Sequence, residues 1–275
     1  MGGLQDNGSW IAPSAAPGGI SNANWKSLYG GDGFWVQPDP LDADIVYAEY
    51  QGGNMARISV STTKSVSIKP QIGAGEEKLR WNWNTPLVTG VKNKNLYTGA
   101  QYLYKSQDKG KNWTRISPDL TTNDKKKQEQ ENSGGLSADN TSAENHCTIF
   151  TIAESPLDEN MIWAGTDDGN IQYTLDAGKN WTNVAANYAQ TGIPAQTWVS
   201  SIEPSLFDKK VVYATFDNHM YGDHKTYIAM SSDMGKTWKK FDSKEFTGFA
   251  HKIKEDIVNK NLLFATQMKV TPGRT

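Results

Sequence analysis

The stretch Ser-Gln-Asp-Lys-Gly-Lys-Asn-Trp at residues 106–113 decides the fold, because the chain repeats its pattern twice more. Residues 174–181 read Thr-Leu-Asp-Ala-Gly-Lys-Asn-Trp, and residues 231–238 read Ser-Ser-Asp-Met-Gly-Lys-Thr-Trp. All three follow the pattern Ser/Thr-x-Asp-x-Gly-x-x-Trp. An Asp oxygen that accepts backbone N–H groups and a Gly at positive φ are typical of a β-hairpin turn. Each copy therefore predicts a turn between two strands, held against the sheet by its Trp.

The pattern resembles the Asp-box, or BNR repeat, of the sialidase-like, sortilin/VPS10-like and xyloglucanase-like β-propellers. This resemblance implies a propeller in which the repeated turns join the outer strands of a blade, on the face opposite the ligand. It therefore implies structural rather than catalytic roles for Asp108, Asp176 and Asp233.

Short apolar strands form a second repeat, aligned on one aromatic residue in each. These aromatics are Tyr47, Tyr97, Trp163, Tyr213 and Phe264, at spacings of 50, 66, 50 and 51 residues. A period near 50 residues is the size of a four-stranded propeller blade. The one longer spacing predicts a polar insertion at about residues 119–141, between two blades.

The sequence therefore predicts an all-β fold, a β-propeller of about five four-stranded blades in a single domain over residues 1–266. Residues 3–8 match residues 165–170, which predicts that the chain opens at the end of a second blade strand. It closes just after another second strand, at Thr266. We expect the N-terminal outer strands to pair with the C-terminal inner strands and to close the ring. An open arc that dimerises is the alternative.

Composition narrows the class of partner. The net charge is −2 and the pI is near 6.1, so no strongly basic surface points to nucleic acid or to an anionic membrane. The single cysteine, Cys147, excludes an internal disulfide framework and is interpreted as a buried structural thiol. No apolar stretch approaches the roughly 20 residues of a membrane helix. The first residues lack the basic and apolar regions of a signal peptide.

A longer resemblance covers residues 2–266. The segments at residues 3–10, 31–34 and 81–86 look like the interior of longer secreted bacterial proteins of the sortilin/VPS10-like, glycosyl-hydrolase group. This resemblance implies a truncated fragment of a secreted or periplasmic parent, whose newly exposed surface could form a homodimer. Residues 267–275 depart from the expected strand connection and look like a non-native tail.

In a propeller, the loops that enter the first strand of each blade share a face with the loops that leave the second strand. On this chain that face gathers carboxylates, amides and imidazoles, which need water, a metal or a ligand as partners. The residues predicted to bind a ligand there are Gln5, Asp6, Trp83, Asn84, Gln101, Asp167, Asp168 and Trp198. The two tryptophans would either offer a platform for a sugar ring or pack between blades.

Histidines on the same face suggest a second function. The candidate ligands of a divalent metal ion are His146, His219 and His251, and the candidate catalytic carboxylates are Glu144, Asp32 and Asp217. Such a set would activate water for the hydrolysis of an ester, a phosphoester or a glycoside. The alternative is that these side chains hydrogen-bond neighbouring blades around a water-filled tunnel.

Several enzyme classes lose support from the sequence. A sialidase needs an arginine triad, whereas this chain has only Arg57, Arg80, Arg115 and Arg274, two of which fall in outer-strand positions. Serine-hydrolase, phosphate-loop and zincin motifs are absent. The sequence favours a propeller module that binds a peptide, a glycan or a small ligand on the face opposite the repeated turns. A metal-assisted hydrolase is the alternative, so whether the chain is an enzyme stays open.

Overall fold

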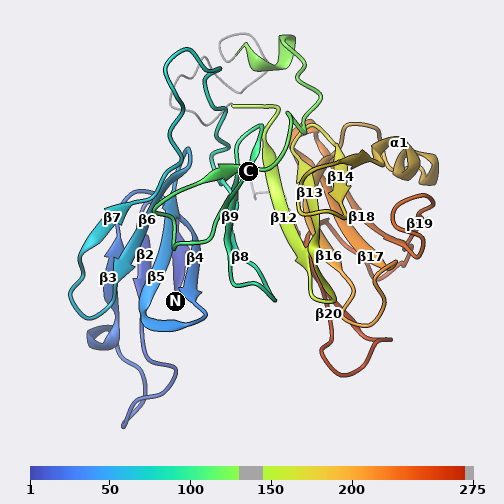
Figure 1. The fold of residues 1–275 in the computed structure, drawn as a ribbon. Coiled ribbons are helices and arrows are strands. Elements are labelled where there is room, and N and C mark those ends of the chain that lie inside the picture. Colours follow the sequence, from blue (N-terminus) through green and yellow to red (C-terminus); the bar gives the residue numbers. More distant parts are fainter. Residues whose placement is uncertain (130–144, 270–275) are drawn as a thin grey trace. The chain divides into compact units, whose positions relative to one another are not determined.

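The computed structural model describes residues 1–129 and 145–269 (Figure 1). The described chain is almost entirely antiparallel β-sheet, with one short α-helix, α1 (Ala185–Tyr188). Four 3-10 turns complete the described elements: η1 (Asn22–Asn24), η2 (Lys126–Gln128), η3 (Ala189–Thr191) and η4 (His219–Tyr221). No helix in the described ranges is long and apolar enough to cross a membrane.

The chain divides into two compact units, each described here by itself. Unit 1 comprises Met1–Thr89, Lys94–Arg115 and Lys125–His146. Unit 2 comprises Gly90–Asn93, Ile116–Asp124 and Cys147–Thr275.

Unit 1 contains three antiparallel sheets. The first has the order β1 (Gly2–Leu4), β2 (Gly8–Ile11), β3 (Lys26–Tyr29). The second has the order β4 (Gly33–Asp39), β5 (Asp42–Tyr50), β6 (Asn54–Ser59), β7 (Ser65–Ser67). The third has the order β8 (Leu87–Thr89), β9 (Leu96–Gly99), β10 (Leu103–Ser106), β11 (Thr114–Arg115).

Unit 2 also contains three antiparallel sheets. One has the order β12 (Ile149–Ser155), β13 (Asp158–Thr166), β14 (Ile171–Thr174), β15 (Thr182–Asn183). The next has the order β16 (Trp198–Pro204), β17 (Val212–Asn218), β18 (Asp223–Ser231), β19 (Lys239–Lys240). The last is the pair β20 (Phe249–Glu255) and β21 (Leu263–Met268).

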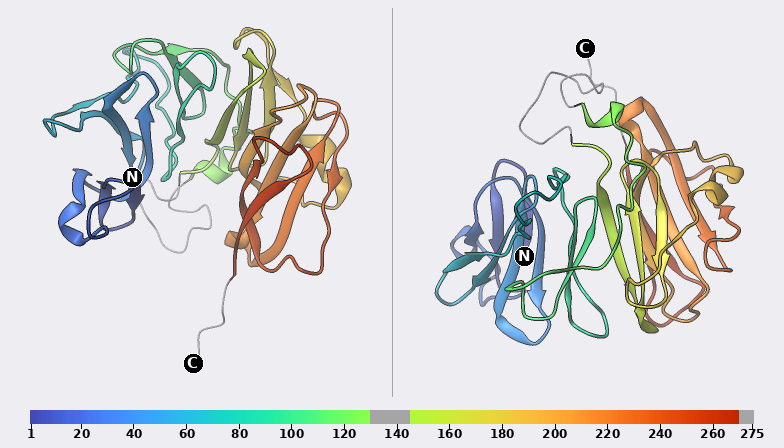
Figure 2. Two further views of the ribbon diagram at one scale, coloured as in Figure 1. Left: turned by 90° about the horizontal axis from the view of Figure 1, so that it is seen from below. Right: turned by 45° about the horizontal axis from the view of Figure 1, so that its top comes forward.

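The order of strands matches the predicted repeat. Each four-stranded sheet follows the chain from its first to its fourth strand, and the aromatic repeat falls on the second strand each time. Within unit 1, the first strands β4 and β8 contact each other; within unit 2, β12 contacts β16 and β16 contacts β20 (Figure 2). The prediction of an all-β fold made of repeated antiparallel sheets is confirmed. The number of blades and the closure of a ring stay predictions.

The three repeated turns share one hydrogen-bonding pattern. After β14, Asp176 accepts the Thr174 hydroxyl at 2.7 Å and the Asn180 backbone N–H at 2.9 Å. The turns after β10 and β18 repeat these bonds at Asp108 and Asp233. Hydrogen bonds from Asn180 are the main reason that the pKa of Asp176 is lowered to about 2, because they stabilise the ionised carboxylate. This geometry supports a structural role for the three carboxylates.

Glycine and tryptophan fasten each turn to the chain before it. Gly178 has a φ of 101°, and a Cβ at this position would lie 2.3 Å from the carbonyl oxygen of Ile116. The indole N–H of Trp181 donates to the same oxygen at 3.0 Å. In unit 1, Trp113 donates in the same way to the Ile68 carbonyl at 2.6 Å. The tryptophan thus ties the first two turns to the chain before them, whereas in the third turn Trp238 donates to Gly235 of its own turn, and Asn187 donates to the same carbonyl at 2.8 Å.

The start of the predicted polar insertion is part of unit 2 and is packed within it. Leu120 is fully buried, and its carbonyl oxygen accepts the side-chain amides of Gln172 at 2.7 Å and Asn170 at 3.0 Å. Cys147 is also fully buried, and burial is the main cause that raises the pKa of its thiol to about 12. Residues 130–144 lie outside the described residues, so the extent of the insertion stays a prediction.

Candidate functional site

The predicted functional face corresponds to one end of the sheet β16–β19. Trp198, at the start of β16, is the register partner of Asp217, near the end of β17. Strand β18 then runs nine residues from Asp223 to the repeated turn that begins at Ser231. At about 3.3 Å per residue, this turn lies about 25 Å from the start of the strand. The two ends of the sheet therefore separate the candidate site from the repeated turn, as the sequence predicts.

Asp217 and His219 form a hydrogen-bonded pair at this end of the sheet. His219 Nδ1 lies 2.6 Å from Asp217 Oδ1, and the His219 backbone N–H donates to the same oxygen at 3.0 Å. The Asp217 side chain is 9% exposed and that of His219 is 37% exposed. A carboxylate oxygen accepts hydrogen bonds, so the neutral tautomer of His219 that fits this contact carries its proton on Nδ1 and leaves Nε2 as the acceptor. The pair is therefore arranged to accept a proton at Nε2.

Strand β20 supports this pair. The His219 ring stacks on the buried Phe249, with 4.3 Å between ring centroids and 14° between ring planes. His251 sits at a β-bulge between Ala250 and Lys252, and it interacts electrostatically with Asp217. The protein around His251 displaces water and lowers the pKa of its imidazole, although part of the side chain stays exposed. Burial therefore favours the neutral form of the His251 imidazole.

The bulge at His251 belongs to a repeated feature of the first strands. Register shifts also occur around Phe150 in β12 and around Ser200 in β16. These positions are 50 and 51 residues apart, which is the spacing of the sequence repeat. Bulges change the direction of side chains and are frequent next to active sites. These bulges are not predictable from the sequence, because no residue type in these strands marks a bulge.

A groove of about 700 Å³ is lined by residues that follow His219 in the sequence, from Gly222 onward, and by the segment that precedes Phe249. One wall is the first half of β18 with the preceding glycine, and the other is the segment from Lys240 to Gly248. The lining includes Asp223, His224, Lys225, Tyr227, Phe241 and Phe246. The His224 ring lies 6.4 Å from the Phe249 ring, which also stacks on His219. Phe249 is therefore close both to the groove residue His224 and to His219 of the hydrogen-bonded pair.

Two groups of the groove hold each other in place. The Tyr227 hydroxyl donates to Asp223 Oδ2 at 2.7 Å, and the Asn218 side-chain amide donates to the same oxygen at 3.3 Å. Burial, followed by the bond to Asp223, raises the pKa of Tyr227 to about 12. Burial acts to raise the pKa of Asp223, but the bonds from Tyr227 and Asn218 outweigh it, so that pKa is lowered. Asp223 is therefore an ionised, oriented acceptor on the groove wall.

Unit 1 brings together Asp6 and Asp32, two of the predicted site residues. Asp32 Oδ1 accepts the backbone N–H of Asp6 at 2.8 Å. The Asp32 N–H in turn donates to Gln51 Oε1 at 2.7 Å. Gln5 precedes Asp6 and is exposed. This end of unit 1 thus carries a polar cluster, whose role as a ligand site stays a prediction.

Glu49 is a buried carboxyl group next to the loop that carries Trp83 and Asn84. It is fully buried, and its Oε1 accepts the backbone N–H groups of Gly53 at 3.3 Å and Thr85 at 3.4 Å. Among the described residues, Glu49 Oε2 and the buried Asn84 Oδ1 have no hydrogen-bond partner. Burial raises the pKa of Glu49 well above its usual value. The loop that precedes β8 is therefore held by a carboxyl group that favours its neutral form.

The raised pKa of Glu49 predicts how the stability of the protein depends on pH. The pKa of Glu49 is higher in the folded than in the unfolded protein, so the folded protein holds a proton on Glu49 at pH values where the unfolded protein has lost it. The free energy of unfolding therefore falls as pH rises above about 4.5 toward the raised pKa. Glu49→Gln keeps the Oε1 acceptor but cannot ionise, so we expect its unfolding free energy to fall less steeply with pH than that of the wild type. Urea unfolding at several pH values measures the difference, with exposed Glu159→Gln as the control. Parallel curves for wild type and Glu49→Gln would contradict this prediction.

The adjacent carboxylates Asp167 and Asp168 are engaged by the protein. Asp167 accepts the Thr148 backbone N–H at 2.8 Å and the Thr148 hydroxyl at 2.6 Å. Asp168 Oδ2 accepts the backbone N–H and the hydroxyl of Thr122, both at 2.7 Å. Both carboxylates are buried. These bonds support structural roles, and a contact with a ligand stays a prediction.

Gln101, Trp198 and Trp83 each make contacts with other residues of the protein. Gln101 Oε1 accepts the Arg80 backbone N–H at 2.8 Å, and its Nε2 donates to the Lys78 carbonyl at 3.1 Å. The Trp198 ring meets Phe150 edge to face, with 4.9 Å between centroids. In the same way, Trp83 of unit 1 meets Phe34 at 6.4 Å. These contacts support the interpretation that the two tryptophans pack between strands of neighbouring sheets.

Neither unit assembles the predicted metal site by itself. Asp32 and His146 belong to unit 1, whereas Asp217, His219 and His251 belong to unit 2. Glu144 lies outside the described residues. Within residues 1–129 and 145–269, no group of three His, Cys, Asp or Glu side chains is arranged to hold a metal ion. The described donors therefore do not fit a metal, and the metal site stays a prediction.

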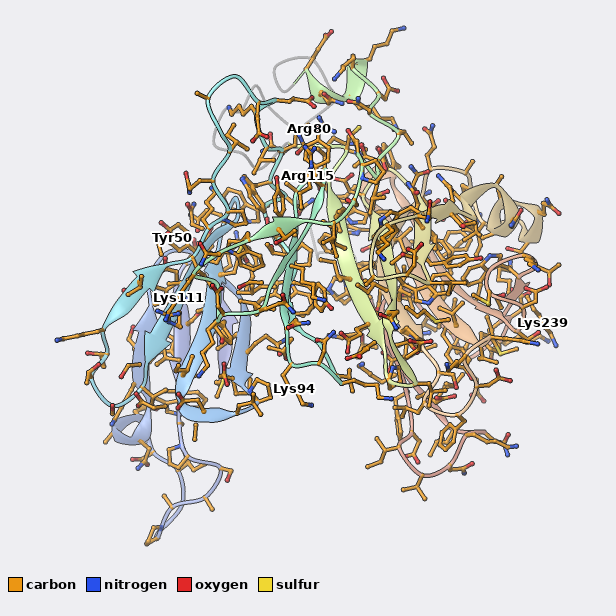
Figure 3. The ribbon with its side chains drawn as sticks, in the orientation of Figure 1. Tyr50, Arg80, Lys94, Lys111, Arg115 and Lys239 are labelled. Atoms are coloured by element: carbon orange, nitrogen blue, oxygen red, sulfur yellow. The ribbon has the colours of Figure 1, made fainter. Side chains whose placement is uncertain are left out.

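The arginines of unit 1 are engaged in local contacts. Arg80 and Arg115, labelled in Figure 3, flank Tyr102 and Glu77. Arg80 pairs with Glu77 at 3.1 Å, and the Arg115 guanidinium lies 4.7 Å from the centre of the Tyr102 ring. Arg57 lies on β6 and Arg115 on β11, which are outer strands as predicted. The structure thus adds no support for a sialidase.

Solved structures provide the one informative comparison, since no family model and no curated protein matches the chain. A GH74 enzyme from Niastella koreensis aligns with a TM-score of 0.52 and 17% identity, over 82% of this chain and 32% of its own. A GH74 xyloglucanase from Xanthomonas campestris aligns with a TM-score of 0.54 and 16% identity, over 89% of this chain and 33% of its own. The chain thus spans about a third of the length of these neighbours. It has a propeller-type fold similar to that of GH74 glycoside hydrolases, whereas its likeness to sortilin stays a resemblance.

Proposed function

We propose that this chain is a glycan-binding β-propeller module whose ligand lies in the groove of unit 2, at the end of the sheet opposite the repeated turn. The observation that carries this proposal is the lining of the groove. Phe241 and Phe246, which also pack against a buried apolar cluster, line the groove together with Lys225 and the oriented Asp223 carboxylate. A sugar ring presents an apolar face and several hydroxyl groups, so aromatic rings next to fixed polar groups suit it.

The class of glycan follows from the shape of the groove and from one neighbour. The groove runs along the first half of β18, so it suits an extended chain rather than a compact ligand. One structural neighbour is a xyloglucanase, which makes a β-glucan such as xyloglucan the first ligand to test. A secreted or periplasmic parent, which the sequence predicts, would meet such polysaccharides. A peptide or another small ligand is the alternative.

Removal of one ring from the groove should weaken this binding. We expect Phe246→Ala to reduce the affinity for xyloglucan oligosaccharides about tenfold, which is about 1.4 kcal/mol, because it deletes an apolar surface for a sugar face. Isothermal titration calorimetry measures the affinity, with cello-oligosaccharides as a second ligand series. Phe207→Ala is the matched control, because Phe207 is 43% exposed and lies outside the groove. No saturable binding by the wild type, or equal affinity for both variants, would refute the proposal.

A metal-assisted hydrolase remains the second function that the sequence predicts. Its test is metal content by mass spectrometry, together with hydrolysis assays before and after chelation. A stoichiometric divalent ion whose removal abolishes turnover would favour it over binding alone. Turnover that is insensitive to chelation would contradict it.

A further inference from the structure

We propose that His219 is the catalytic base of an esterase activity, directed at acyl groups on a glycan held in the groove of unit 2. The choice of a glycan ester as the substrate rests on the proposed function. The chemistry itself rests on the Asp217–His219 pair and on its position at the end of the groove.

Three contacts hold the imidazole ring of His219 in one orientation. Asp217 Oδ1 contacts Nδ1 at 2.6 Å and also accepts the backbone N–H of His219 at 3.0 Å. Phe249, which is 5% exposed, covers one face of the ring. Nε2 lies on the side of the ring away from Asp217, and the His219 side chain is 37% exposed, so a ligand can reach this nitrogen. A base held in this way loses little freedom when it takes a proton, which favours catalysis.

The chain joins this base directly to the groove. His219 begins the turn η4, and the residue after that turn, Gly222, is part of one groove wall. Gly248 is part of the other wall, and it precedes Phe249. The groove residue His224 lies close to Phe249 as well. A ligand in the groove would therefore lie next to the Asp217–His219 pair.

The local carboxylates favour an ester over a glycosidic bond. A glycosidase needs two carboxyl groups that flank the bond, one to donate a proton and one to attack or to activate water. Here Asp217 is occupied by His219, Asp223 by Tyr227 and Asn218, and the groove residue Asp242 by an ion pair with Lys240 at 3.1 Å. Hydrolysis of an ester needs only one group that accepts a proton and then returns it. A single oriented imidazole can perform both steps.

The reaction balances without a cofactor or a covalent intermediate on the protein. Nε2 of His219 takes a proton from water while the water oxygen attacks the carbonyl carbon of the ester. The tetrahedral intermediate then breaks its bond to the sugar oxygen, and Nε2 returns the proton to that oxygen. The products are a carboxylic acid and a glycan hydroxyl group.

Asp217 is a positioning residue in this scheme. As an acceptor, it keeps the proton of neutral His219 on Nδ1. The amide group of Asp217→Asn can instead donate to Nδ1, which places the proton on Nε2 and removes the base. Correlation of the ring nitrogens with ring protons by NMR reports the tautomer directly. We expect protonated Nδ1 in the wild type and protonated Nε2 in Asp217→Asn.

The activity is measured as acetate release from acetylated xyloglucan oligosaccharides and as hydrolysis of 4-nitrophenyl acetate. We expect His219→Gln to lower kcat/KM by about 10²–10⁴-fold, the range for loss of a general base. Asp217→Asn should lower kcat with little change in KM. Met220→Ala is the matched control, because Met220 is the next residue in the same turn and its side chain is 60% exposed. The melting temperature of each variant shows that it folds.

The outcomes separate this inference from the proposed function. Loss of 4-nitrophenyl acetate hydrolysis in His219→Gln, in a protein that binds no glycan, would support the base and refute the glycan ligand. Glycan binding with equal ester hydrolysis by the wild type and His219→Gln would overturn the esterase alone. Absence of hydrolysis in the wild type, or an Nε2-protonated tautomer of neutral His219 in the wild type, would also overturn it.

Discussion

Replacement of Trp163 with alanine is expected to lower the free energy of unfolding by about 3–5 kcal/mol, the range for removal of a large buried aromatic side chain. Trp163 lies on β13 with 1% of its surface exposed, and its ring packs on Tyr173 with 4.7 Å between centroids. It belongs to a cluster that also contains Val199 and Phe216 from the neighbouring sheet. Side-chain contacts of this kind join the two sheets, so their loss should weaken the packing of unit 2. Urea unfolding followed by circular dichroism measures the change.

A second variant, Trp163→Phe, distinguishes the contribution of the aromatic ring from that of the indole N–H. Trp163 Nε1 is buried, and it has no hydrogen-bond partner in the described part of the chain. Trp163→Phe removes this N–H and keeps most of the apolar surface, so we expect it to cost about 1 kcal/mol. A cost equal to that of Trp163→Ala would contradict this account, because it would mean that the apolar ring kept by phenylalanine contributes little to stability at this position.

The fold was predictable because its signal is local and repeated. In the turn around Asp176, the identities of Thr174, Gly178 and Trp181 are each explained by a contact that the turn itself makes. The aromatic residue on each second strand gave the period, and the structure places all five on second strands. Agreement among several copies makes such a prediction robust even where one copy departs from the pattern.

The candidate site was predictable only in part, because its contacts join residues far apart in the sequence. The order of strands placed Asp217, His219 and His251 at one end of the sheets, and the structure brings the first two into contact. Nothing in the sequence shows that Phe249 would stack on His219, since their contact depends on how β20 packs against β17. The partners of buried carboxylates such as Asp168 are also far away in the sequence. From the sequence alone, such a carboxylate therefore resembles a ligand-binding group.

Asp168→Ala is expected to lower the free energy of unfolding by about 3 kcal/mol, because it removes three hydrogen bonds and a typical hydrogen bond contributes about 0.5–1.5 kcal/mol. Asp168 is fully buried. Its Oδ2 accepts both the backbone N–H and the hydroxyl of Thr122 at 2.7 Å, and its Oδ1 accepts the Thr166 hydroxyl. These bonds hold the segment Ile116–Asp124 against the loop that follows β13. The loss should appear in urea unfolding and as faster proteolytic cleavage within that segment.

Stability and affinity together decide whether Asp168 is a structural or a ligand-binding residue. Lys209→Ala provides the control for stability, because Lys209 lies outside the groove, forms an exposed ion pair with Asp158 at 3.0 Å, and should change the unfolding free energy by about 0.5 kcal/mol or less. The structural role predicts a large loss of stability in Asp168→Ala, with unchanged glycan affinity in the fraction that stays folded. A ligand role predicts the opposite, weaker binding by a protein as stable as the wild type. That second result would return Asp168 to the binding face on which its position in the sequence places it.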